Sequence, residues 1–130
     1  MSIINLLNYL EIITEEVQKT IVKLSLQVDA RHLQPYGIMH GGMSGILIET
    51  ACSLGANAQL DTNTQHAVGV DLTVNHLKAV TGGKLNVIAT PDRIGRTIQV
   101  WQATITNERH EKIAVGRCTL TVGTHDTPAQ

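Results

Sequence analysis

Apolar and polar side chains alternate along several stretches of this chain. The clearest alternation runs from Val22 to Val28, and a second one runs from Val68 to Val74. Successive side chains of a β-strand point to opposite faces, so each run predicts a strand with one face in a core. Weaker or shorter runs predict further strands over residues 11–19, from residue 85, and over residues 98–106 and 113–122.

Residues 40–60 follow a different pattern. Glu49 is the only Asp, Glu, Lys or Arg in this segment, which is otherwise rich in small and aliphatic side chains. A helix that is weakly polar all round is buried, so we expect a long helix here that is covered on most sides. We also expect a short helix over residues 3–10 capped by Ser2, a loop over residues 29–39, and a disordered tail over about residues 124–130.

The expected order is two strands, a long helix and four more strands. One antiparallel sheet curling around the helix would cover it, which is an α+β arrangement in a single domain with its core at about residues 11–123. Such a sheet leaves its two edge strands unpaired, and we therefore expect association with a second copy.

Composition and charge argue against several classes of function. Aromatic residues make up 2% of the 130 residues and the net charge is −1, which argues against a nucleic-acid-binding surface. No apolar run is long enough to span a membrane. Cys52 and Cys118 form no CxxC motif, and the first residues lack the basic start of a signal peptide. These features favour a cytoplasmic protein with reduced thiols.

A motif before and within the expected helix resembles that of a known enzyme family. Gly37 is followed by His40-Gly41-Gly42 and then by Glu49, and the segments 68–76 and 95–96 are also similar. The resemblance, over about residues 20–122, is to hotdog-fold acyl-CoA thioesterases of the phenylacetate type, relatives of 4-hydroxybenzoyl-CoA and 1,4-dihydroxy-2-naphthoyl-CoA thioesterases. It implies hydrolysis of an acyl- or aroyl-CoA to a free acid and CoA, without a cofactor, by a homodimer or a tetramer.

The resemblance also implies roles for individual residues. Glu49 matches the catalytic carboxylate, as nucleophile or as general base, and Gly41 matches the backbone N–H that holds the thioester oxygen. Gln34 and His40 match polar groups near the carbonyl, and Ser53 matches a hydroxyl one turn past the carboxylate.

The chemistry supports two of these roles independently. A lone carboxylate in an apolar helix is costly without a function or a partner, so Glu49 is either catalytic or satisfied by a neighbour. Gly41 stands at the expected helix start, where N–H groups lack internal partners, although it is also an ordinary residue for helix entry. The two are eight residues apart, or about 12 Å at roughly 1.5 Å per residue. We therefore expect each active site to be shared between two chains.

Other candidates are weaker. Cys52 is near Glu49, whose charge disfavours the thiolate. The six histidines show no metal-ligand spacing, so no metal is expected. Lys78, Arg93 and Arg96 fall in or beside turns, where they either meet CoA phosphates or are simply solvated. A hotdog dehydratase or hydratase, or an acyl-CoA-binding module without catalysis, remain the alternative functions.

Overall fold

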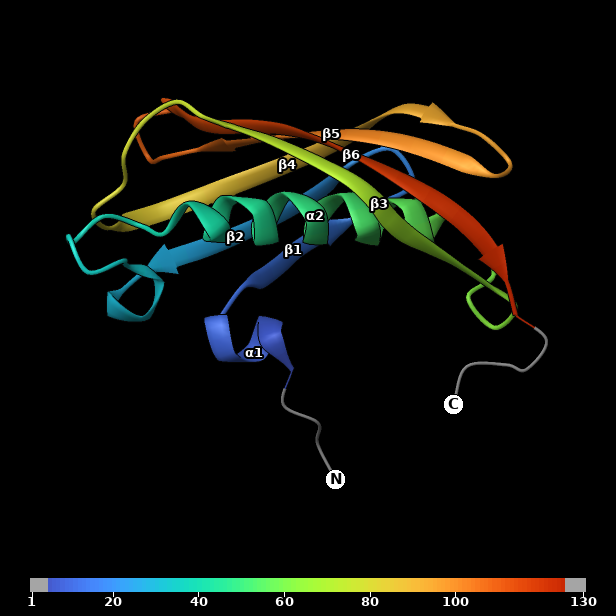
Figure 1. Cartoon of the computed structure of the whole chain (residues 1–130), viewed down its shortest axis with the longest axis horizontal. Coiled ribbons are helices and arrows are strands. Elements are labelled where there is room, and N and C mark those ends of the chain that lie inside the picture. Colours follow the sequence, from blue (N-terminus) through green and yellow to red (C-terminus); the bar gives the residue numbers. More distant parts are fainter. Residues whose placement is uncertain (1–4, 126–130) are drawn as a thin grey trace.

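The computed structural model of the protein describes residues 5–125. Its elements are α1 (Leu6–Leu10), β1 (Ile13–Val17), β2 (Val22–Val28), the 3-10 turn η1 (Ala30–His32), α2 (Gly41–Ala58), β3 (Gln65–His76), β4 (Gly83–Ile94), β5 (Ile98–Thr106) and β6 (Lys112–Thr124). All neighbouring strands are antiparallel, in the order β1-β2-β4-β5-β6-β3. The sheet curls over α2 (Figure 1), which confirms the predicted α+β class and element order.

Small residues allow α2 to lie directly against the sheet. A Cβ atom on Gly55 would lie 2.4 Å from the Trp101 ring, and a Cβ on Gly116 would lie 2.8 Å from Ile48. Because real Cβ atoms do not approach so closely, these two glycines set the distance between helix and sheet. The buried stripe of α2 consists of Met43, Ser44, Leu47, Ile48, Ala51, Cys52, Gly55 and Ala56.

The opposite side of α2 is open in the single chain. Gly41, Gly42 and Glu49 are exposed and seven other residues of α2 are half-buried, so the expected cover is complete on the sheet side and only partial on the opposite side. The sheet wraps one side of the helix only, and the weakly polar composition of the other side then leaves apolar and small residues without a cover.

β3 departs from the predicted alternation. Val68 and Val70 are 60% and 59% exposed, whereas the neighbouring Ala67 is buried. A bulge between Gly69 and Asp71 adds a residue to the strand, so Val68 no longer shares a face with Val74, which is half-buried. The prediction that the apolar set from Val68 to Val74 faces the core of this chain is therefore wrong. β3 is an edge strand, and its exposed valines lie beside an unpaired backbone.

The ends of the chain differ in detail from the prediction. α1 begins at Leu6 and is capped by Asn5, whose side chain accepts a hydrogen bond from the Asn8 N–H at 3.1 Å. The expected cap Ser2 lies outside the described residues. β6 extends through Thr124, which the expected tail included, and residues 126–130 lie outside the described part of the chain. No helix in residues 5–125 is both long and apolar enough to cross a membrane.

Candidate active site

The start of α2 offers an unused hydrogen-bond donor. His40 is the N-cap, and its Nδ1 accepts a hydrogen bond from the Gly42 N–H at 2.8 Å. Gly41 is the first helical residue, and its N–H has no acceptor among the described residues. A Cβ on Gly41 would lie 3.2 Å from two atoms of the His76 ring. The Gly41 N–H is thus a free donor beside an imidazole at the positive end of a helix.

A pocket of about 360 Å³ opens at this helix start, and it brings together three of the predicted residues, Gln34, Gly41 and Lys78. Gln34 Oε1 accepts a hydrogen bond from the Tyr36 N–H at 2.7 Å, so the oxygen is fixed by its own turn. The side-chain N–H groups of Gln34 have no acceptor among residues 5–125. They are therefore available to a ligand.

His76 lines the same pocket, although the sequence assigned it no individual role. It is the last residue of β3, and the return of that strand alongside α2 is what places its ring against Gly41. Its position at the end of the 68–76 segment, which resembles the family, was the one available signal.

Glu49 lies two turns further along α2, above β3. A Cβ on Gly69 would lie only 2.6 Å from Glu49 Oε2, so the missing side chain of Gly69 makes room for the carboxylate. Glu49 is exposed, and among the described residues its carboxylate accepts no hydrogen bond and forms no ion pair. The alternative of a buried glutamate satisfied by a neighbour does not apply to this chain.

Glu49 and Ser53 share a second pocket, of about 380 Å³, whose other lining residues are Leu7, Thr50 and Leu54. Ser53 is one helical turn past Glu49, on the same side of α2. The Ser53 Oγ lies 3.4 Å from the Asn57 amide nitrogen, a long contact. Its hydroxyl proton is therefore available to the carboxylate or to a ligand.

A single chain does not bring the candidate oxyanion donor, Gly41, close to the candidate catalytic carboxylate, Glu49. No described residue lines both the pocket of Gly41 and that of Glu49, and His40 lines a third pocket with His32. Along the helix the separation from Gly41 to Glu49 is about 12 Å. A thioester carbonyl within hydrogen-bond reach of the Gly41 N–H is thus out of reach of Glu49 in the same chain.

The three basic residues that are candidates for binding CoA lie in two separate places. Lys78 precedes β4, whereas Arg93 and Arg96 lie at the other end of this strand, about 30 Å away at roughly 3.3 Å per residue. Lys78 Nζ donates to Glu111 Oε2 at 2.7 Å, and this hydrogen bond is the main reason why the pKa of Glu111 is lowered. A phosphate at Lys78 must compete with that carboxylate, while the exposed Arg96 has no such competitor among the described residues.

The two thiols are unsuited to nucleophilic attack. Burial raises the pKa of Cys52, and the neighbouring Cys118 and Glu49 raise it further. Burial also raises the pKa of Cys118 to about 11, with additional contributions from Glu49 and Asp71. Both thiols are therefore protonated at neutral pH.

Comparison with known proteins identifies the family. The model of the thioesterase superfamily matches residues 36–114. The chain is 34% identical to the 1,4-dihydroxy-2-naphthoyl-CoA hydrolase of Listeria monocytogenes over 113 residues, which cover 87% of this chain and 89% of the relative.

Two solved structures are similar in both fold and sequence. The thioesterase HI1161 from Haemophilus influenzae has a TM-score of 0.85 and 37% identity, over 91% of this chain and 82% of that one. The thioesterase SAV0944 from Staphylococcus aureus has a TM-score of 0.87 and 31% identity, over 90% and 97%. The latter was solved as a glutamine-to-alanine mutant, and a glutamate-to-alanine mutant of SAV0944 is also known. The matched family model covers most of the chain, and with these relatives it confirms the resemblance seen in the sequence: the chain belongs to the thioesterase superfamily, has the hotdog fold, and is a thioester hydrolase.

Proposed function

We propose that the protein hydrolyses an acyl-CoA thioester to a free acid and CoA, with Glu49 as the catalytic carboxylate and the Gly41 N–H as the oxyanion donor. The observation that carries the proposal is the state of Glu49. It is the only charged residue of α2, it lies over a glycine that makes room for it, and no described residue pairs with it. A carboxylate kept free in this way is available for reaction.

Two features of the relatives support this assignment. The Listeria relative is named for an aroyl-CoA substrate, which makes CoA thioesters the first class to test. In SAV0944 the mutated glutamine and glutamate have the same separation along the chain as Gln34 and Glu49 here.

The active site is assembled from two chains. The exposed side of α2 carries both Gly41 and Glu49, and Gly69 of the edge strand β3 lies beneath Glu49. If two copies pack with their α2 helices antiparallel about a two-fold axis, the helix start of one copy faces Glu49 of the other. This homodimer covers the exposed side of α2 and contains two equivalent sites. A tetramer, as the family resemblance implies, would be built from such dimers.

In each site the thioester oxygen accepts a hydrogen bond from the Gly41 N–H, whose position at the helix start favours the developing negative charge. Gln34 and His76 line the pocket of this donor and orient the carbonyl, while His40 holds the helix start in place through the Gly42 N–H. Glu49 of the other copy attacks the carbonyl carbon to give an anhydride, which water then cleaves, or it takes a proton from water as the water attacks. In both routes the C–S bond breaks and the CoA sulfur leaves as a thiolate that is protonated by solvent.

Glu49→Ala and Glu49→Gln test the assignment, with release of free thiol from a panel of acyl-CoAs as the readout. Turnover should fall by at least about a hundredfold, the low end of a general-base contribution, while circular dichroism and thermal unfolding show a folded protein. Glu16→Gln is the matched control, because Glu16 is an acidic residue of β1 that lines neither pocket, and its one ion pair among the described residues is with Lys23 at 3.8 Å.

Near-normal turnover in a folded Glu49→Ala protein refutes the role of Glu49. Thermal stabilisation by acyl-CoA without any thiol release in the wild type identifies an acyl-CoA-binding module instead, and a change in enoyl absorbance identifies a hydratase. Incorporation of ¹⁸O into Glu49 during a single turnover in H₂¹⁸O identifies the nucleophilic route. Attack by Glu49 places ¹⁸O in its carboxylate when the anhydride is cleaved at the protein carbonyl, whereas general-base catalysis places it only in the acid product.

A further inference from the structure

The short helix α1 is attached to the rest of the fold by a cluster of polar contacts rather than by its own stability. It has five residues, too few for an isolated helix, and its side chains Leu6 and Tyr9 are 54% and 66% exposed. At its end, Glu11 adopts φ 56, which turns the chain out of the helix. The carbonyl groups of this last turn then need partners from elsewhere.

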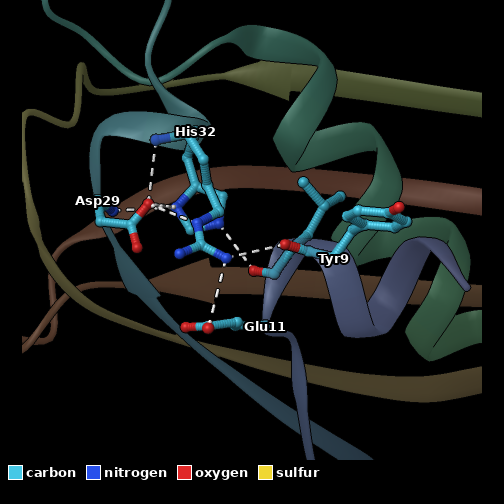
Figure 2. Close-up of polar contacts among 6 residues, drawn as sticks. Tyr9, Glu11, Asp29 and His32 are labelled. Atoms are coloured by element: carbon cyan, nitrogen blue, oxygen red, sulfur yellow. Dashed lines mark hydrogen bonds and ion pairs between the residues drawn. The ribbon is translucent and has the colours of Figure 1, made fainter. Parts of the chain in front are cut away.

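Residues of η1 supply those partners (Figure 2). His32 is fully buried, its Nε2 donates to the Leu10 carbonyl at 2.8 Å, and its Nδ1 accepts from the Asp29 N–H at 3.0 Å. These two contacts fix the neutral tautomer with the proton on Nε2. Arg31 donates to the Tyr9 carbonyl at 3.0 Å and lies 3.4 Å from the Glu11 carboxylate.

Arg31 is itself held in place. Its Nε donates to Asp29 Oδ1 at 3.1 Å, and the same oxygen accepts the Arg31 backbone N–H at 3.0 Å. The Asp29–Arg31–His32 group therefore connects the end of β2 to the end of α1, across more than twenty residues of sequence. We call this group the α1 anchor.

The anchor places α1 beside Glu49. Leu7 lines the pocket that also contains Glu49, Thr50, Ser53 and Leu54, so the pocket has α1 on one side and the middle of α2 on the other. The Leu7 carbonyl also accepts the Ile12 N–H at 3.0 Å, which ties its turn to the start of β1.

Charge decides which end of a thioester this pocket accepts. None of the described residues that line it is basic, it contains the Glu49 carboxylate, and its walls carry Leu7 and Leu54. CoA phosphates are repelled by such a lining, whereas an apolar acyl group gains by burial there. The basic residue Lys78 lines the other pocket, with Gly41.

We propose that α1 forms a wall of the acyl-binding pocket, with Leu7 in contact with an apolar acyl group, and that Arg31 and His32 are positioning residues that hold this wall in place. The inference rests on the proposed function of Glu49. The site would thus discriminate between acyl groups by their apolar extent beyond the carbonyl, and the N-terminal helix would set that preference.

Leu7→Ala tests the wall, with Leu6→Ala as the matched control because Leu6 is the exposed neighbour on the same helix. The readout is kcat/KM for hexanoyl-CoA and benzoyl-CoA, each divided by the value for acetyl-CoA. Leu7→Ala should lower both ratios by about tenfold, a typical effect of removing apolar contact from a specificity pocket. Leu6→Ala should leave the ratios and the thermal unfolding temperature unchanged.

Arg31→Ala tests the anchor. It should lower the same ratios as Leu7→Ala, and Arg31→Lys should restore part of the loss. In the double variant Leu7→Ala/Arg31→Ala the effects should be clearly less than multiplicative, since a displaced α1 no longer presents Leu7. A general loss of stability would lower kcat/KM for all three substrates alike and leave the ratios constant.

If the ratios are unchanged in both Leu7→Ala and Arg31→Ala, and turnover still depends on Glu49, then α1 is not a wall of the acyl-binding pocket. The proposed function is unaffected by that result. A wild-type protein that hydrolyses none of the three thioesters overturns the proposed function, and with it the inference.

Discussion

Gly69→Ala is a sensitive probe of the position of Glu49. The added Cβ would lie 2.6 Å from Glu49 Oε2, whereas ordinary contacts begin at 3.4 Å, so the carboxylate must move by about 0.8 Å. A displacement near 1 Å at a reacting group costs up to roughly a hundredfold in rate. We therefore expect kcat to fall by about 10- to 100-fold.

The free energy of unfolding should rise slightly or stay unchanged, although kcat falls. Gly69 does not have a positive φ, and the clashing atom is the free end of an exposed side chain. Alanine then stabilises slightly through the unfolded state, by about 0.4–1 kcal/mol. Gly123→Ala is the control, because its Cβ would meet nothing within 4 Å.

The assay is steady-state thiol release with thermal unfolding measured in parallel. Wild-type kcat in Gly69→Ala, together with a melting temperature equal to that of Gly123→Ala, would show that the carboxylate over Gly69 is not the reacting group.

Two further predictions concern the cations and the thiols. Lys78→Ala should raise KM for acyl-CoA more than it lowers kcat, because a phosphate contact is equally strong in ground and transition states. The substitution should have a smaller effect on KM for an acyl-pantetheine, which lacks the nucleotide. An unchanged KM for acyl-CoA would place the nucleotide away from Lys78, nearer Arg93 and Arg96. Burial raises the pKa of Cys118 to about 11 in the folded protein, whereas a cysteine in an unfolded chain has a pKa of about 8.5. The protonated thiol therefore contributes its full stabilisation below pH 8.5, and this stabilisation is lost as the pH rises toward 11. Cys118→Ala should show a smaller decrease in melting temperature over that interval, and equal decreases in both proteins would contradict the assignment.

The fold could be predicted largely from residue patterns. The alternation from Val22 to Val28 and the weakly charged segment around Glu49 identified β2 and α2, because local periodicity determines these elements directly. β3 was predicted as a strand, but the burial of Val68 was wrong. The bulge after Gly69 depends on pairing with β6, which is far away in the sequence.

The candidate site could also be predicted only in part from the sequence. The motif indicated Gly41 and Glu49, and their spacing already implied that one chain separates them. Neither pattern nor spacing revealed that Gly69 makes room for the carboxylate, that His76 lies against Gly41, or that Leu7 lines the pocket of Glu49. These three relations arise from tertiary packing between elements, and a single sequence contains no local signal for them.

The most direct test of the account is complementation between two inactive variants. Glu49→Ala removes the carboxylate, and Gly41→Pro removes the N–H. The backbone accepts proline at Gly41, because this residue is the first of α2 and His40 before it is extended, with φ −60 and ψ 132. The added Cβ, 3.2 Å from the His76 ring, requires that ring to shift by a few tenths of an ångström. Each variant alone should form folded homodimers without activity.

Unfolding and refolding the two variants together produces hybrid dimers. In a hybrid, one site combines the Gly41 N–H of one copy with Glu49 of the other, and the second site lacks both groups. Random pairing gives about half hybrids with one intact site each, so activity should return to about a quarter of the wild-type value. Hybrids that form, remain folded and stay inactive would contradict the shared site and place the whole reaction within one chain.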